Sequence, residues 1–207
     1  MASVKTLQFL PCGRNYSEFT SVDVSPRYIF PEVCMTYYGS KEMAESWRTV
    51  RKNTLQVAED IPEEKYSFRA APDTMSIGEM LAHLAASPHW AIQCHFVEKK
   101  TAVSMEDFGK WMGEIGIASK GLTTKAAIVE ALTANGETFA AGLAAMGEEQ
   151  LAEQVTVPNG AKSRFEILQG VKEHEMHHRA QLFLLERMVG IVPHLTRARQ
   201  AAHAARK

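Results

Sequence analysis

The spacing of apolar residues predicts four helical segments in this chain. Between residues 41 and 60, apolar side chains recur three and four positions apart, which is the period of one face of an α-helix. The same period returns in residues 76–99, 124–146 and 163–190. The face of the first segment consists of Met43, Trp47, Val50, Thr54, Val57, Ala58 and Ile61. Four amphipathic segments favour a helical bundle, in which each helix buries its apolar face against the others.

Residues at the ends of these segments support the assignment. Ser40 precedes the first segment as a candidate N-cap. Ser76 and Ser163 are each followed three residues later by a glutamate, a pattern typical of the capping box that begins a helix. Pro88 lies inside the second segment, and because proline has no backbone N–H we expect a kink there.

The stretches between and around the segments predict less regular structure. Residues 100–123 form a long connection between the second and third helices, with one short helical turn expected around Trp111. Residues 155–160 predict a short extended piece and a turn. Residues 1–39 contain three prolines and several aromatic residues, and they predict an irregular arm that packs on the domain or on a partner subunit.

We therefore expect an all-α chain in three parts: an irregular arm at 1–39, a four-helix bundle at 40–192 and a basic tail at 193–207. The charged residues of the tail are Arg197, Arg199, Arg206 and Lys207. Such a tail can bind nucleic acid, but beside a nearly neutral remainder it is more typical of a solvated helix end.

Composition narrows the class of protein. The chain has 207 residues, of which 45% are hydrophobic and 23% charged, as in ordinary globular domains. Its formal net charge of -1 argues against a strong attraction to nucleic acid or to an anionic membrane. No apolar stretch approaches the ~20 residues that span a bilayer. Three widely spaced cysteines without a CxxC pair favour a reducing compartment, so we expect a cytoplasmic protein with no nucleic-acid or membrane partner.

Chemistry concentrates in the last helical segment, which contains His174-Glu175-Met176-His177-His178. At about 100° per residue, His174 and His178 point ~40° apart, so both imidazoles can reach one ion. Both lie on the apolar face, where a histidine needs a hydrogen-bond partner or a metal. Such a pair arises by chance in roughly a third of shuffled chains of this histidine content, so the pair alone is a modest signal.

His83, in the second segment, is the candidate third ligand. It lies at the edge of the stripe formed by Ile77, Leu81 and Leu84, where a side chain can face both the core and a solvent-filled mouth. Edge histidines are more often surface residues than ligands. Glu79, one turn earlier on the same side, could accept a hydrogen bond from His83 and orient its ring.

Two motifs resemble the DinB-like family of metal-binding bundles. Residues 75–84, with the sequence MSIGEMLAHL, resemble the second helix of that family. The fourth-helix pattern of the family is His, three residues, then His-Arg-Gly-Gln, and the matching residues are His174, His178, Arg179 and Gln181. The resemblance covers roughly residues 41–191. Ala180 replaces the usual glycine and Met75 replaces a frequent aromatic residue, but neither is a ligand position.

This resemblance implies a fold, a cofactor and a range of activities. It implies a four-helix bundle with a long connection between helices 2 and 3. It also implies that His83, His174 and His178 bind one divalent ion, commonly zinc or nickel, with water at the remaining positions. Related bundles include thiol-dependent transferases and isomerases, so a small-molecule thiol or electrophile is the expected partner. Dimerisation through bundle faces is frequent in the family, which implies a homodimer here.

Three other interpretations compete with a metal-dependent transferase or isomerase. The ion could be non-catalytic and simply stabilise the bundle or serve binding. The segment also matches the HExxH pattern of zinc peptidases, with Glu175 as general base. The extended form of that pattern needs a glycine and a histidine where this chain has Gln181 and Leu184. The other common form takes a downstream glutamate as third ligand, but the only acidic residue after His178 is Glu186, on the same helix. A ferritin-like di-iron site needs a second Glu-x-x-His, which the chain lacks.

Several further residues are expected to lie near the site or in the core without binding the ion. His177 is expected to border the site rather than bind the ion. His89 and His95 point away from His83 on a helical wheel and are expected at the surface or between helices. Cys94 is expected to be a small core residue, and Gln181 to form a hydrogen bond within the bundle.

Overall fold

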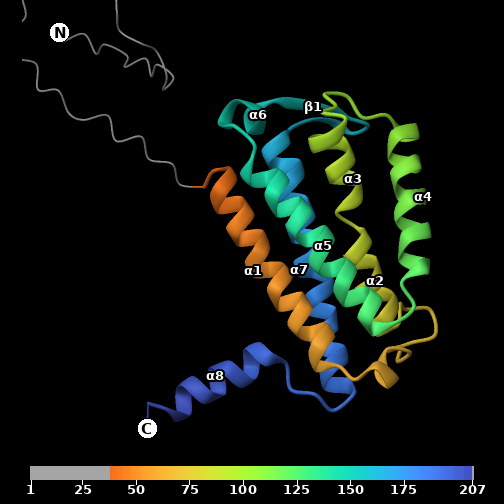
Figure 1. Ribbon diagram of the computed structural model, residues 1–207, viewed down its shortest axis with the longest axis vertical. Helices are drawn as coiled ribbons and strands as arrows, with labels where there is room; N and C mark the ends of the chain where they lie inside the picture. The colour runs from red at the N-terminus through yellow and green to blue at the C-terminus, as the bar shows by residue number, and fades with distance from the viewer. Residues whose placement is uncertain (1–37, 207) are drawn as a thin grey trace, which may run out of the picture. The chain divides into compact units, whose positions relative to one another are not determined.

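The computed structural model describes residues 38–206, and the body of this part of the chain is a helical bundle (Figure 1). The helices α1 (Ser40–Asp60), α2 (Ile77–Ala86), α5 (Lys125–Ala144) and α7 (Arg164–Met188) form the bundle and run side by side in the figure. The predicted all-α four-helix class is therefore confirmed. Residues 1–37, which make up nearly all of the predicted arm, lie outside the described residues.

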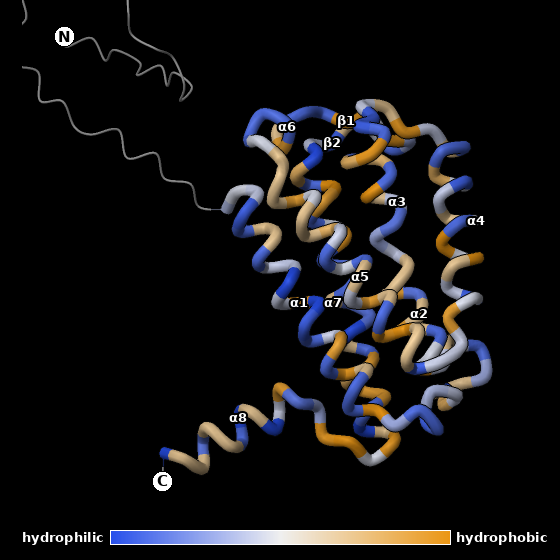
Figure 2. Tube along the Cα trace, in the orientation of Figure 1, coloured by the Kyte–Doolittle hydropathy of each residue, from blue (hydrophilic) through white to orange (hydrophobic). Residues whose placement is uncertain are grey.

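The apolar faces of these helices form the core, as the alternation of apolar and polar residues along each helix suggests (Figure 2). All seven residues of the predicted α1 face are buried. Trp47 on α1 packs edge-on against Phe139 of α5, and its indole N–H donates to the carbonyl of Gly136 over 2.8 Å. These contacts anchor α1 against α5.

The predicted capping boxes start two of the helices. The Ser76 and Ser163 hydroxyls accept the backbone N–H groups of Glu79 and Glu166, and each glutamate carboxylate accepts the backbone N–H of its serine. The N-cap of α1 is Gly39 rather than the predicted Ser40, which is the first helical residue.

The second helical path is broken, as predicted, at Pro88. Helix α2 ends at Ala86, and the path continues as the short α3 (His89–Ala91) and the π-helical segment η2 (Ile92–Val97). Proline cannot donate the backbone hydrogen bond that a continuous helix needs at this point. Packing also constrains η2, because the Phe96 ring occupies the space that a Cβ atom on Gly142 of α5 would need.

The connection at 100–123 is where the prediction was wrong. Instead of one turn around Trp111, it contains a full helix, α4 (Met105–Gly121). Ser104 caps this helix by accepting the backbone N–H of Asp107. Trp111 and Ile115, four residues apart, are its only buried side chains among the described residues. Several glycines weaken the helical signal of this segment because glycine has a low helix propensity.

A small hairpin joins the last two bundle helices. After α6 (Glu148–Ala152), strand β1 (Gln154–Val157) pairs antiparallel with β2 (Gly160–Ser163). The predicted extended piece and turn are confirmed, and β2 completes the hairpin. Gly160, the first residue of β2 after the turn, has a φ of 127°, a conformation that favours glycine.

The remaining elements lie at the other end of the bundle in Figure 1. The short η1 (Glu63–Lys65) follows α1, and α8 (His194–Ala204) follows α7. No side chain of α8 is buried, as expected for a solvated helical tail. Between residues 38 and 206, none of the helices has the length and apolar character needed to cross a membrane.

Candidate metal centre

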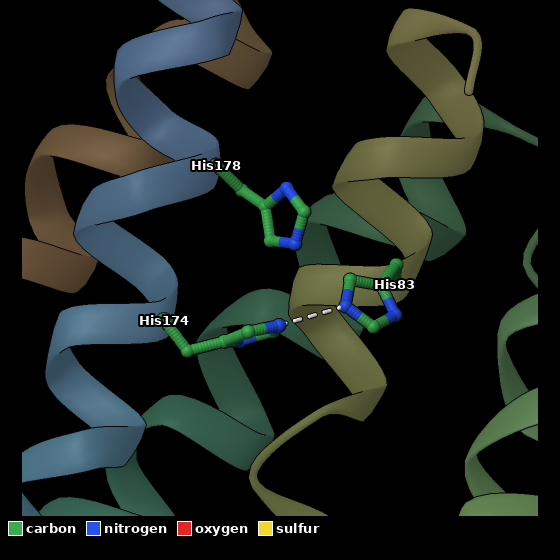
Figure 3. Close-up of side chains that lie close together, drawn as sticks. All are labelled: His83, His174 and His178. Atoms are coloured by element: carbon green, nitrogen blue, oxygen red, sulfur yellow. Dashed lines mark hydrogen bonds between the residues drawn. The ribbon is translucent and has the colours of Figure 1, made fainter. Parts of the chain in front are cut away.

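Three histidines from two helices meet on one side of the bundle (Figure 3). His83 projects from α2, and His174 and His178 project from successive turns of α7. One ring nitrogen of each lies within 4.8 Å of the others. The Nε2 atoms of His83 and His174 are 3.0 Å apart. The structure thus brings together the three residues that the sequence analysis singled out.

The electrostatics of the cluster keep these imidazoles neutral. All three side chains are half-buried. Burial, together with repulsion from the neighbouring His178, His83 and His177, lowers the pKa of His174 to about 4. Burial is also the main cause of the lowered pKa values of His83 and His178. A neutral imidazole exposes a lone pair, which is the form that binds a metal.

Gln181 orients one of the three rings. The Nδ1 atom of His178 lies 2.7 Å from the Gln181 side-chain oxygen, so Nδ1 carries the proton and donates it. The lone pair of His178 is then on Nε2. Gln181 is exposed, rather than inside the bundle as predicted, and its amide lies 3.4 Å from His177. His177 is also exposed and stands outside the cluster, as expected.

A cavity of about 290 Å³ adjoins the cluster. His83 and His174 form part of its wall, and most of the remaining wall is apolar. Its apolar side chains are Trp90, Phe108, Met112, Ile115 and Val171. No carboxylate lines this cavity within the described part of the chain, so the two histidines and Ser87 are its polar side chains.

Glu175, adjacent to His174 in sequence, does not face the cluster. Its side chain is 1% exposed and lies inside the bundle, where Arg51 donates to it over 2.6 Å and Thr54 over 2.8 Å. Burial raises the pKa of this carboxyl, and the two partners oppose the rise. Glu175 is therefore unavailable as the general base of an HExxH peptidase, and that interpretation is wrong for this site.

Glu79 also differs from the expectation. Its carboxylate accepts hydrogen bonds from the backbone of Ser76 and from Arg69, and more than half of its side chain is exposed. The capping box at the start of α2 fixes Glu79 there, so it does not orient His83. The prediction of that contact was wrong.

The other candidate residues lie away from the cluster. His89 lies 2.7 Å from Glu114 and so joins α3 to α4, as expected for an inter-helix residue. Cys94 is buried, and burial raises its thiol pKa to about 11, which fits a core residue rather than a nucleophile. His95 is 3% exposed and lies 2.8 Å from Arg164 at the start of α7.

The geometry of the cluster fits one divalent ion. Two nitrogens that are each about 2.1 Å from a shared ion lie roughly 3 to 3.4 Å apart, close to the separation between His83 and His174. Three neutral nitrogen donors are a common ligand set for zinc and nickel and leave at least one position for another ligand. The cavity lies beside two of the three donors, so that position is accessible to a small molecule.

Comparison with known proteins places this chain in a family. The family model described as the DinB superfamily matches residues 46–182. The Bacillus subtilis protein YjoA is 25% identical over 156 residues, which make up 73% of this chain and 91% of YjoA. The crystal structure of YjoA, described as a DinB-like protein, superposes with a TM-score of 0.53 at 23% identity and covers 72% of this chain and 92% of YjoA.

Two structures with functional descriptions share the fold. YfiT from Bacillus subtilis, described as a probable metal-dependent hydrolase with an unusual four-helix bundle topology, has a TM-score of 0.58 at 14% identity, with 82% of this chain and 95% of YfiT covered. The mycothiol-dependent maleylpyruvate isomerase has a TM-score of 0.53 at 14% identity, with 70% of this chain and 61% of the isomerase covered. With a family model that spans most of the bundle, this chain belongs to the DinB superfamily.

Proposed function

We propose that the protein binds one divalent ion, zinc or nickel, through His83, His174 and His178, and that it acts as a thiol-linked transferase or isomerase on a small molecule. The observation that carries this proposal is the convergence of three neutral imidazoles beside an open cavity. The descriptions of YfiT as metal-dependent and of the isomerase as thiol-dependent support the same class of chemistry.

The ligand set favours reactivity at the ion. Three imidazoles carry no negative charge, so a divalent ion would keep its full charge toward a fourth ligand. Bound there, the ion would supply Lewis acidity that lowers the pKa of a coordinated thiol. The chain's own residues would hold and enclose the substrate: Trp90, Phe108 and Met112 would pack on its apolar part and exclude water.

A non-catalytic ion is the second candidate, and one feature favours it. His83 is on α2 and the other two donors are on α7, so an ion at the cluster would crosslink two bundle helices. Such a crosslink would stabilise the folded state because the unfolded chain cannot present the same site.

Metal content tests the proposed ligands. The purified wild-type protein should contain about one divalent ion per chain by elemental analysis. His83→Ala, His174→Ala and His178→Ala should each lose most of it, because two imidazoles bind far more weakly than three. His177→Ala is the matched control, since this exposed residue is on the same helix and outside the cluster. Full occupancy in the His83 variant would refute the contribution of α2.

Binding of an external ligand to the ion distinguishes a thiol-linked transferase or isomerase from a protein whose ion only stabilises the bundle. With cobalt substituted, addition of 2-mercaptoethanol should produce a thiolate-to-metal absorption band and shift the ligand-field bands, because sulfur replaces water. The visible spectrum during the titration measures this. If thiols, imidazole and azide all leave the spectrum unchanged, the open position does not exist and the ion is a stabiliser of the bundle.

A further inference from the structure

A second, larger cavity shares two lining residues with the one beside the histidine cluster. Its volume is about 430 Å³, and it lies between η2, α4, the hairpin turn and α7. Trp90 and Phe108 line both cavities and so form their shared wall. A molecule bound in the larger cavity therefore lies next to the space that adjoins His83 and His174.

The wall of the larger cavity is mainly apolar. Its apolar side chains include Trp90, Val103, Met105, Phe108, Val157 and Ile167. Met105 is 68% exposed and Phe108 is 42% exposed, so both leave apolar surface in contact with water at this cavity. A ligand that covered them would remove apolar surface from water, which is the main source of affinity in such sites.

One polar group in this wall has no partner. His95 lines the cavity and is 3% exposed, and its Nε2 atom has no hydrogen-bond partner among the described residues. A buried polar atom of this kind costs free energy until something pairs with it. His95 also borders a smaller, polar cavity on the Arg164 side. A ligand in the larger cavity lies against the His95 ring, and because Nε2 has almost no accessible surface, a small shift of a wall side chain would bring the two into contact.

The neighbouring arginine decides what that ligand atom is. Arg164 can only donate, so the Nδ1 atom of His95, 2.8 Å away, must accept. The proton of the neutral ring is therefore on Nε2, which makes the unpaired atom a donor. Arg164 is itself satisfied by the Lys100 carbonyl and by the Glu153 carboxylate, so it leaves no charge for an anionic ligand to neutralise.

We propose that this cavity binds the apolar part of a neutral small molecule and that His95 Nε2–H donates a hydrogen bond to its carbonyl or ether oxygen. The identification of this molecule as the substrate rests on the proposed function, because it would be held beside the histidine cluster. Binding in the cavity itself requires no ion. His95 is then a specificity-determining residue that selects ligands with an acceptor oxygen.

A pair of fluorescent probes tests the cavity and the hydrogen bond separately. Prodan is a neutral two-ring ketone, and 2-(dimethylamino)naphthalene is its match without the carbonyl. Both should bind saturably at one site, and the ratio of their dissociation constants reports the contribution of the carbonyl. In His95→Phe this ratio should fall about threefold to tenfold, the usual value of one hydrogen bond. His95→Gln, which can both accept from Arg164 and donate to a ligand, should retain the ratio.

A second variant locates the site. Phe108→Lys changes a half-exposed residue, so folding should survive, and it should weaken both probes about tenfold because the shared wall loses its apolar surface. This variant decides the outcome if circular dichroism shows that His95→Phe is unfolded. Unchanged affinity in Phe108→Lys, or an unchanged ratio in a folded His95→Phe protein, would overturn the proposal.

Dialysis against a chelator separates this inference from the proposed function. Both probes should bind the protein equally before and after the treatment, because the cavity does not include a proposed ligand. If chelation abolishes binding, the probes bind at the ion and the separate cavity site is refuted, whereas the metal proposal stands. If the protein contains no metal yet binds the probes with the expected ratio, the metal proposal fails and the cavity site stands.

Discussion

Glu175→Ala should destabilise the protein by about 3–5 kcal/mol, the usual cost of removing one partner from a buried ion pair. Glu175 and Arg51 are 1% and 4% exposed, and their charged atoms are 2.6 Å apart. A guanidinium stays protonated inside proteins. The variant would therefore leave a buried positive charge without its counter-charge.

The effect should spread through the bundle because Arg51 contacts several helices. Besides Glu175 on α7, its guanidinium donates to the carbonyl of Leu84 on α2 over 3.2 Å and to that of Leu132 on α5 over 3.1 Å. Arg51 itself belongs to α1. One side chain therefore joins all four bundle helices, and α2 and α7 are the two that present the histidines. We expect Glu175→Ala to weaken metal binding as well as stability.

Urea denaturation measures the free energy of unfolding for this variant. Glu173→Ala is the matched control, because Glu173 is exposed on the same helix, and it should change stability by less than about 0.5 kcal/mol. The double variant Arg51→Met with Glu175→Leu removes both charges and should recover most of the loss. A loss below about 1 kcal/mol for Glu175→Ala would show that water or movement of Arg51 compensates the charge.

Glu186→Gln should stabilise the protein at pH 8 by an amount on the order of 2 kcal/mol. Glu186 is fully buried on α7, and neither carboxylate oxygen has a hydrogen-bond partner among the described residues. Burial, and to a smaller extent Asp60 on α1, raise its pKa to about 7 against the opposing effect of Arg197 and Arg187. At pH 8 the wild-type protein therefore holds a buried carboxylate, which glutamine replaces with a neutral group of similar shape.

The sign of the pH dependence follows from the two states. The pKa of Glu186 is higher in the folded state than in the unfolded state, so between these values the folded state binds more protons. Its contribution to stability is fully present below the unfolded value, falls as pH rises, and is lost above about 7. Urea titrations of wild type and Glu186→Gln at pH 5 to 8 measure the difference in their free energies of unfolding. The titration of other groups affects both proteins equally and cancels in this difference. A difference that is the same at every pH would contradict the assignment.

The sequence predicted the bundle where the apolar period was clear. Helices α1, α5 and α7 have buried faces spaced three and four residues apart, and their predicted bounds differ from the observed ones by a few residues. Helix α4 was missed for a physical reason. Its sequence mixes glycines, charged residues and apolar residues that turn out to be exposed. Only two residues, Trp111 and Ile115, mark the face that is buried.

The candidate site was predictable only in part. His174 and His178 are one helical turn apart, so their proximity follows from local geometry, but the place of His83 beside them came from the family resemblance. The signal for the Arg51–Glu175 pair was present, because each charge occupies a position on the apolar face of its helix. The pairing itself could not be predicted, because a helical wheel does not show which helices meet.

His95 lies between helices, one of the two places that the sequence predicts, but its burial depends on an irregular helix. The π-helical turns of η2 begin at Ile92 and contain more residues per turn than an α-helix, so they change the direction of the side chains within them. His95 is buried there against Arg164. Such an irregularity depends on packing against α5 and α7 and has no clear local sequence signal.

Two of the three histidines are on one helix and the third is on another, and this has a consequence for the order of folding. His174 and His178 become neighbours as soon as α7 forms, whereas His83 and His174 are 91 residues apart in sequence. Closing so long a loop costs entropy that only the assembled bundle repays. A nascent α7 can therefore offer two donors early, and the third arrives only when α2 docks. Tight coordination by all three would mark the final stage of folding, after α2 and α7 have come together.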